Sequence, residues 1–200
     1  MEFVRRRCAT PATLGVLAGA FNPPTIAHVA LLEAARASVD HVVFVIPRTF
    51  PHKAFHGATL EERLRMLEAL ENDAGPFSIA ITEGGLFIEI ARECRQAYAP
   101  EVDVAFICGR DAAERIITWD YGDPAAIERM LSEFRLLVAA RAGEFHAPPR
   151  LVDRIQSLDL PANLDQVSST EIRDCLAQGR PWQSHAPAPL RAMITEIYRR

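Results

Sequence analysis

The sequence predicts an α/β fold, a doubly wound parallel sheet with helices on both faces. Apolar, β-rich runs alternate with helical patterns along the chain, and such alternation is typical of parallel sheets. Two runs, His41–Pro47 and Val102–Gly109, are apolar almost throughout, as expected of strands buried on both faces. The composition, 49% hydrophobic and 24% charged residues, is ordinary for a globular protein.

The first half of the chain is expected to alternate strands and helices from its first apolar run onward. Thr13–Gly19 is a short apolar strand that a loop follows. Ala27–Val39 has apolar residues at helical spacing, which predicts a helix. Leu60–Glu71 has leucines on one stripe and charges opposite, and Thr59 with Glu62 forms a capping box at its start. The other elements expected here are the strands His41–Pro47 and Phe77–Thr82 and the helix Phe87–Ala97.

The second half continues the alternation and ends in helices. Asp123 is the expected N-cap of a helix whose first position is Pro124, a residue favoured there. Ser168 or Ser169 caps a later helix, which Gly179 ends. The expected elements are the strands Val102–Gly109 and Phe134–Arg141 and the helices Asp111–Ile117, Pro124–Glu133, Pro149–Leu158, Ser169–Gln178 and Pro189–Arg199. We interpret residues 1–200 as one domain, because no composition shift marks a boundary.

The balance of charges argues against a nucleic-acid partner. Lys and Arg number 22 and Asp and Glu number 26, so the net charge is −4. A mildly acidic chain does not coat nucleic acid by charge alone, so any anionic ligand has to be held by a local cluster. No apolar run is long enough to span a bilayer, and we expect no membrane partner. The sequence leaves the oligomeric state open, and a homo-oligomer is allowed.

The cysteines predict reduced thiols in a cytoplasmic protein. They are scattered, with no Cys-x-x-Cys pair and no histidine at zinc-ligand spacing, so we expect no protein-built metal site. The four are Cys8, Cys94, Cys108 and Cys175. The basic Met1–Arg7 and apolar Ala12–Phe21 are similar to a short signal peptide, but the apolar run leads directly into a functional loop, and we expect it to be retained.

The most informative residues follow the first predicted strand. Ligands of doubly wound sheets bind at the carboxyl ends of the strands. There, Gly19 and Ala20 let backbone N–H groups approach a ligand, and two prolines stiffen the turn. Thr25 then stands near a helix N-terminus, where orphan N–H groups favour anions, and His28 adds a side-chain donor one turn on. An ordinary strand–turn–helix with a structural histidine is the alternative interpretation.

Two other strand ends and one helix N-terminus offer groups of the same kind. Lys53 follows the second strand and supplies a point charge for a phosphate. Gly109 and Asp111 follow the fourth strand, where glycine permits close approach and the carboxylate suits a ribose hydroxyl. The segment Ser168–Arg173 opens a helix with hydroxyls, N–H groups and a cation. Taken singly, each is also consistent with a plain loop or helix cap. Together they predict a site that positions and neutralises a polyphosphate without covalent catalysis.

Two motifs identify a family resemblance. The segment from Ala18 to His28, AGAFNPPTIAH, resembles the G-G-x-F-[DN]-P-x-[HT]-x-G-H signature of the nucleotidyltransferase superfamily, and Val167–Arg173, VSSTEIR, looks like its second signature. Within that superfamily the sequence is most similar to bacterial nicotinate-nucleotide adenylyltransferases. Pro51–Lys53 and the segment from Phe106 to Trp119 support this likeness. The resemblance implies a Rossmann-like fold of the nucleotidyltransferase type, to which about residues 165–200 contribute the second signature.

The resemblance also implies a reaction and its substrates. AMP is transferred from ATP to the phosphate of nicotinate or nicotinamide mononucleotide, pyrophosphate leaves, and the product serves NAD biosynthesis. Mg²⁺ is implied on the ATP phosphates, since the sequence shows no carboxylate cage for it. A relative that acts on phosphopantetheine or a polyol phosphate, and an inactive nucleotide-binding paralogue, are the alternatives.

The resemblance assigns roles to individual residues. The reacting phosphates are implied to contact His28, Thr25, Lys53 and Arg173. The rest of ATP, including the outgoing pyrophosphate, is implied to contact Gly19, Ala20, Phe21, Gly109, Asp111, Ser168, Ser169 and Thr170. The acceptor is implied to contact Trp119, which would stack on the pyridine ring, and Phe87. The segment Gly84–Ala91 departs from the nicotinate-specific pattern P-S-[YF]-T-x-[DE]-T-L, so the acceptor half of the site is less well matched than the nucleotide half.

Overall fold

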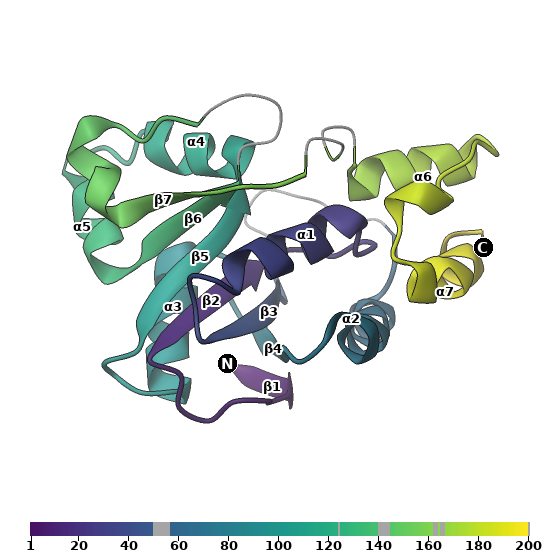
Figure 1. Ribbon diagram of the computed structural model, residues 1–200, viewed down its shortest axis with the longest axis horizontal. Helices are drawn as coiled ribbons and strands as arrows, with labels where there is room; N and C mark the ends of the chain where they lie inside the picture. The colour runs from purple at the N-terminus through teal and green to yellow at the C-terminus, as the bar shows by residue number, and fades with distance from the viewer. Residues whose placement is uncertain (50–56, 124, 140–144, 162–163, 165–166, 200) are drawn as a thin grey trace.

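The computed structural model describes residues 1–49, 57–123, 125–139, 145–161, 164 and 167–199. Within these residues seven strands form one sheet, in the order β1-β4-β3-β2-β5-β6-β7 (Figure 1). The strands are β1 (Glu2–Arg5), β2 (Thr13–Ala18), β3 (His41–Pro47), β4 (Ser78–Thr82), β5 (Asp103–Gly109), β6 (Arg135–Ala139) and β7 (Ile155–Leu158). From β4 to β7 all neighbours are parallel, and β1 pairs with β4 antiparallel at one edge.

The strand order indicates where along the sheet a ligand is expected to bind. Along the chain, β2, β3 and β4 are added toward one edge, and β5, β6 and β7 toward the other. The order therefore reverses between β2 and β5, which pair directly. In such a Rossmann-like sheet the crevice outside the carboxyl ends at the reversal is the usual ligand site. The predicted α/β, doubly wound fold is confirmed.

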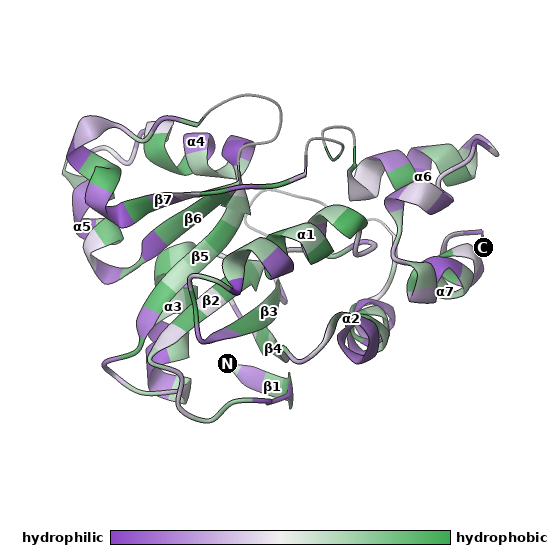
Figure 2. Ribbon diagram, in the orientation of Figure 1, coloured by the Kyte–Doolittle hydropathy of each residue, from purple (hydrophilic) through white to green (hydrophobic). Residues whose placement is uncertain are grey.

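Helices cover both faces of the sheet, because each central strand sends alternate apolar side chains to opposite sides. Phe44 and Ile46 pack with α1 and α2, whereas Val43 and Val45 pack with α3 and α5. Figure 2 shows the strands as largely hydrophobic and the outer side of α2 as polar. The helices are α1 (Ile26–Ala35), α2 (Leu60–Ala74), α3 (Phe87–Ala97), α4 (Arg110–Thr118), α5 (Ala126–Glu133), α6 (Ser169–Ala177) and α7 (Arg191–Tyr198), with short 3-10 turns η1 (Pro149–Arg154), η2 (Gln183–His185) and η3 (Ala188–Leu190).

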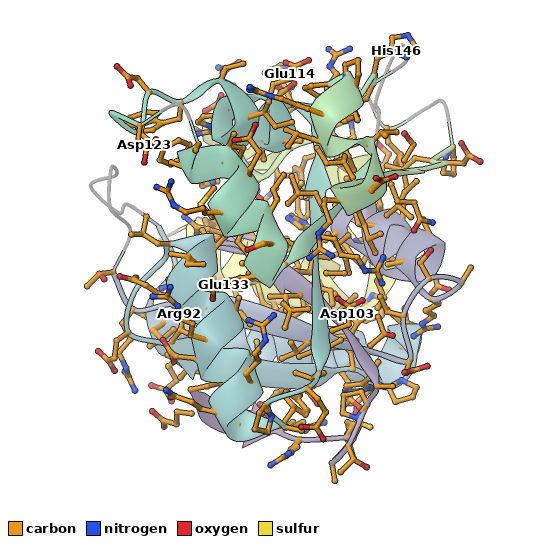
Figure 3. All side chains as sticks on the ribbon, turned by 90° about the vertical axis from the view of Figure 1, so that its left-hand side faces the viewer. Arg92, Asp103, Glu114, Asp123, Glu133 and His146 are labelled. Carbon is orange, nitrogen blue, oxygen red and sulfur yellow. The ribbon has the colours of Figure 1, made fainter. Side chains whose placement is uncertain are left out.

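Side-chain contacts stabilise the helices, and one of them was predicted. The Thr59 hydroxyl accepts the Glu62 N–H at 3.2 Å and the Glu62 carboxylate accepts the Thr59 N–H at 2.8 Å, so the predicted capping box of α2 is present. Between the helices on the other face, Arg92 of α3 donates to the Glu133 carboxylate of α5 at 2.7 Å, and Figure 3 shows these two side chains facing one another. Within the described part of the chain, none of the helices has the length and apolar character needed to cross a membrane.

Two local predictions were wrong, and one strand was missed. The segment Pro149–Leu158, predicted as a helix, is the 3-10 turn η1 followed by strand β7, which extends the sheet beside β6. The antiparallel edge strand β1 was not expected, because its charged ends give it no apolar run. Asp123 is not the N-cap of α5; that position is Ala125, and the Asp123 carboxylate instead accepts the Ala125 N–H at 2.9 Å in the turn before it.

Ion pairs between two arginines and Glu71 connect the edge of the sheet to α2. The Glu71 carboxylate accepts from Arg5 at 2.7 Å and from Arg7 at 2.9 Å, and its side chain is only 5% exposed. These arginine hydrogen bonds, that from Arg7 foremost, hold the pKa of Glu71 below its ordinary value of 4.5. Because the folded-state pKa is depressed, the stabilisation is present above pH 4.5 and is lost as pH falls through the folded-state pKa.

We therefore expect Glu71→Gln to lower the free energy of unfolding at neutral pH by about 1 kcal/mol, a modest value because both arginines are partly exposed to solvent. The difference from wild type should shrink as pH falls below 4.5. Urea unfolding at a series of pH values measures it. A difference that stays constant across the series would show that Glu71 acts through packing and not through its charge.

Candidate active site

The loop between β2 and α1, residues Gly19–Thr25, lies at the carboxyl end of β2, next to the reversal of strand order. We call it the β2–α1 loop. Phe21 has a positive φ of 48°, so the chain turns sharply there, and its ring is buried against Phe44. The Asn22–Pro23 peptide bond is cis. The sharp turn brings the backbone from the end of β2 to the N-terminus of α1.

His28 and Thr25 form the N-terminus of α1. The Nδ1 atom of His28 accepts the backbone N–H of Thr25 at 2.9 Å, and it lies 2.9 Å from the Thr25 hydroxyl. Because Nδ1 accepts that N–H, the hydrogen of the neutral imidazole is on Nε2. The ring of Phe21 packs edge-on against the imidazole, with centroids 5.1 Å apart. The loop and the helix cap thus fix both the orientation and the tautomer of His28.

Three side chains hold carbonyl oxygens of the β2–α1 loop. Arg63 of α2 donates to the carbonyl of Ala20 at 3.1 Å, and Arg173 of α6 donates to the carbonyl of Asn22 at 2.5 Å. The Ser169 hydroxyl donates to the carbonyl of Pro23 at 2.7 Å. Arg63 is buried, and burial lowers the pKa of its guanidinium. Side chains from α2 and α6 therefore fix the path of the loop.

The side chain of Asn22 is the centre of a second set of contacts. Its Oδ1 accepts the Tyr198 hydroxyl at 2.5 Å and the backbone N–H of Ala58 at 3.1 Å. Gly57, with a φ of 124°, lies so close that a Cβ there would be 2.6 Å from the amide nitrogen of Asn22. Asn22 itself is 5% exposed. The loop is thereby joined to the start of α2 and to the C-terminal helix α7.

The helix that carries the second motif begins where the sequence predicts. The Ser168 hydroxyl caps α6 by accepting the Glu171 N–H at 3.0 Å. The Thr170 hydroxyl accepts from Arg173 at 3.2 Å. Arg173 and Ser169, predicted as phosphate ligands, thus contact the β2–α1 loop, and their phosphate contacts remain predictions. Lys53 lies outside the described residues.

The end of β5 lies on the other side of the reversal. Among the described residues, no atom would lie within 4 Å of a Cβ added at Gly109. Asp111 follows in the first turn of α4, with its side chain 91% exposed. The predicted contacts of Gly109 and Asp111 remain predictions.

The two aromatic residues predicted for the acceptor differ in their surroundings. Trp119 follows α4 and is 53% exposed, and it helps to line a cavity of about 480 Å³ together with Tyr121 and Arg150. Phe87 instead stacks on Phe106 with ring centroids 4.0 Å apart, on the core side of α3. Packing accounts for the aromatic ring at that position, and its acceptor contact remains a prediction.

The described residues contain no group of three or more His, Cys, Asp or Glu side chains that could hold a metal ion. The side chains that surround the β2–α1 loop are instead cations and neutral donors: Arg63, Arg173, His28, Ser169 and Tyr198. An arrangement of cations and N–H groups around a helix N-terminus suits a polyphosphate.

Comparison with known protein families supports the same interpretation of the site. The model of the cytidylyltransferase-like family matches residues 16–175, which include both motifs. The chain belongs to the cytidylyltransferase-like family. The nucleotidyltransferase class and enzyme activity that the sequence predicts are therefore confirmed at the level of the family.

Several named proteins are similar to this chain over almost their full length. The chain is 30% identical to a protein of Exiguobacterium sibiricum, over 92% of this chain and 96% of that one. It is 32% identical to a protein of Solibacter usitatus, over 88% and 94%. Both carry the name "Probable nicotinate-nucleotide adenylyltransferase". The fold matches that of Plasmodium falciparum nicotinic acid mononucleotide adenylyltransferase complexed with NaAD, with a TM-score of 0.68, 18% identity, and coverage of 92% and 95%.

Sequence reasoning did not identify three residues of this cytidylyltransferase-like site. Asn22, Arg63 and Tyr198 are each within hydrogen-bond distance of a loop atom or of one another. Asn22 lies inside the first quoted motif and Arg63 inside the predicted helix Leu60–Glu71, but the sequence analysis gave neither a role. Their low exposure is visible only in the structure, because a buried arginine and an exposed one look alike in a helical pattern.

Proposed function

We propose that this protein transfers AMP from ATP to the phosphate of nicotinate mononucleotide and releases pyrophosphate, a step of NAD biosynthesis. The names of the similar proteins support the acceptor, and the geometry of the β2–α1 loop supports the nucleotide. The proposal includes one domain over residues 1–200, a cytoplasmic location, and no nucleic-acid or membrane partner.

One observation carries the proposal: Nδ1 of His28 accepts the Thr25 N–H in the cap of α1, so the hydrogen of a neutral imidazole would be on Nε2. A phosphate oxygen of the acceptor attacks the α-phosphorus of ATP, the new P–O bond forms, and the bond to the pyrophosphate oxygen breaks. The acceptor phosphate is already an anion, so no strong general base is needed. His28, at the N-terminus of a ten-residue helix, is then a donor to the negative charge on the reacting phosphates.

The residues around the loop fit an ATP that brings its own Mg²⁺. When bound, Mg²⁺ supplies charge neutralisation on the phosphates. The cations Lys53 and Arg173 are proposed to neutralise the rest of the charge. Ser168, Ser169 and Thr170, at the N-terminus of α6, are proposed to hold the leaving pyrophosphate, and Gly109 and Asp111 the adenosine.

The test is pyrophosphate release from ATP and Mg²⁺ with nicotinate mononucleotide, nicotinamide mononucleotide or phosphopantetheine as acceptor, and with no acceptor. We expect release with nicotinate mononucleotide and little without an acceptor. Release with phosphopantetheine alone would replace the proposed acceptor with the alternative that the segment Gly84–Ala91 favours. Release with none, from protein that still binds ATP, would contradict the proposed activity.

Trp119 provides a separate test of the acceptor half. Its exposed ring beside a cavity suits stacking on the pyridine, and such stacking contributes about 1–3 kcal/mol per ring. Trp119→Ala is expected to raise the KM for nicotinate mononucleotide about 5- to 150-fold and to leave the KM for ATP unchanged, as steady-state kinetics with each substrate varied will show. Equal changes in both constants would argue against an acceptor-specific role.

A further inference from the structure

The C-terminal helix α7 reaches the β2–α1 loop through one hydroxyl. Tyr198 ends this helix, and its hydroxyl lies 2.5 Å from Oδ1 of Asn22, 176 positions earlier in the chain. Figure 1 shows α7 beside α6 and α2, at the end of the molecule away from β5, β6 and β7. A tyrosine that served only to pack α7 would need its ring there but not a hydrogen bond to the loop.

The hydroxyl of Tyr198 is suited to act as a permanent donor. The side chain is half-buried, and burial raises the pKa of its phenol, although the nearby cations Arg173 and Arg63 oppose the shift. The hydroxyl therefore stays protonated at physiological pH. The same Oδ1 of Asn22 accepts the N–H of Ala58. Hydrogen bonds from Tyr198 and from Ala58 therefore both hold the side-chain amide of Asn22.

The backbone of Asn22 is held as well, and this links its position to the shape of the loop. Arg173 donates to its carbonyl, and the preceding residue, Phe21, is the one with a positive φ. A shift of Asn22 would change the backbone on either side of it, including the part that leads to Thr25 and His28. Loss of the Tyr198 hydroxyl would thus be felt at the loop and not only at the end of α7.

We propose that Tyr198 is a positioning residue, whose hydrogen bond to Asn22 sets the β2–α1 loop in the form that holds the phosphates of ATP. This inference rests on the proposed function only in taking ATP as the nucleotide bound at the loop. It requires that the effect of Tyr198 fall on the phosphates and not on the adenosine, which is proposed to lie at the end of β5.

The test is Tyr198→Phe, which removes the hydroxyl and keeps the ring. Calorimetric titration with ATP and with adenosine is expected to show about tenfold weaker binding of ATP and unchanged binding of adenosine, because a buried hydrogen bond is lost at the loop. The matched control is Thr195→Val, which removes another hydroxyl of α7 that bonds within the helix, and it should bind both as wild type does. Equal weakening of ATP and adenosine, or none, would overturn the proposal.

A double-mutant cycle tests whether Tyr198 acts through Asn22. In an Asn22→Ala background, Tyr198→Phe should have no further effect on ATP binding, whereas additive effects would overturn the proposed route. Should Asn22→Ala fail to fold, the comparison of ATP with adenosine decides alone. A wild type that binds ATP but releases no pyrophosphate with nicotinate mononucleotide would refute the acceptor and leave this test valid, and a wild type that does not bind ATP would refute both proposals.

Discussion

Replacement of His28 by asparagine is expected to lower kcat about 10²- to 10³-fold while leaving the protein folded, the range found when a single transition-state donor is removed. The asparagine amide oxygen can occupy the place of Nδ1 and accept the Thr25 N–H, so the cap of α1 is kept. No donor then stands where Nε2 was. Initial rates of pyrophosphate release and a thermal melt of the same sample measure the two effects.

His28→Ala is the comparison variant, because it removes both ring nitrogens. It leaves the Thr25 N–H without its partner, a loss of about 1 kcal/mol for a helix cap. This variant should be less stable than His28→Asn and equally inactive. If the asparagine variant turned over at the wild-type rate, the Nε2 hydrogen would have no part in the reaction.

Replacement of Arg63 by methionine is expected to lower kcat/KM about 10²-fold, the loss that a small misplacement of reacting groups produces. Arg63 holds the carbonyl of Ala20, and in a planar trans peptide the C=O and the next N–H point in opposite directions. The arginine therefore turns the N–H of Phe21 away from α2. Methionine has a similar length and keeps the packing, but it cannot donate to the carbonyl.

Arg65→Met is the control for the Arg63 variant, since Arg65 lies on the same helix with its side chain exposed. It should keep wild-type kinetics. Urea unfolding of both variants shows whether a lower kcat/KM comes from a change in the loop or from a less stable fold. An Arg63→Met protein that unfolds at the wild-type urea concentration and retains wild-type kcat/KM would show that the carbonyl contact does not matter to the site.

Most of the fold could be predicted because its signals are local. The limits of β3 and α3 match the predicted ranges His41–Pro47 and Phe87–Ala97, where apolar pattern and length both pointed to one structure. Ile155–Leu158 and Glu2–Arg5 were missed, because each is a four-residue edge strand with only two apolar residues. Such a strand is defined by its pairing with a neighbouring strand, and its own sequence is too short to show a hydrophobic pattern that predicts it.

The residues of the site also separate into those that the sequence could predict and those that it could not. His28 and Thr25 could be found from sequence, because a helix cap is made by residues three positions apart. The contacts of Arg63, Asn22 and Tyr198 could not, because they join segments 43 and 176 positions apart. Phe87 stacks on Phe106, a contact that its place in the sequence does not reveal, and its predicted acceptor contact stays a prediction.

The distant contacts of the β2–α1 loop also set the order in which the loop is completed during synthesis. Chains are made from the N-terminus, and the partners of the Pro23 carbonyl, the Asn22 carbonyl and the Asn22 amide lie 146, 151 and 176 positions later. All seven described strands precede Tyr198, so a nascent chain can complete them while Tyr198 is still to be added. The loop therefore gains its hydrogen bond from Tyr198 only after the whole described sheet has been synthesised.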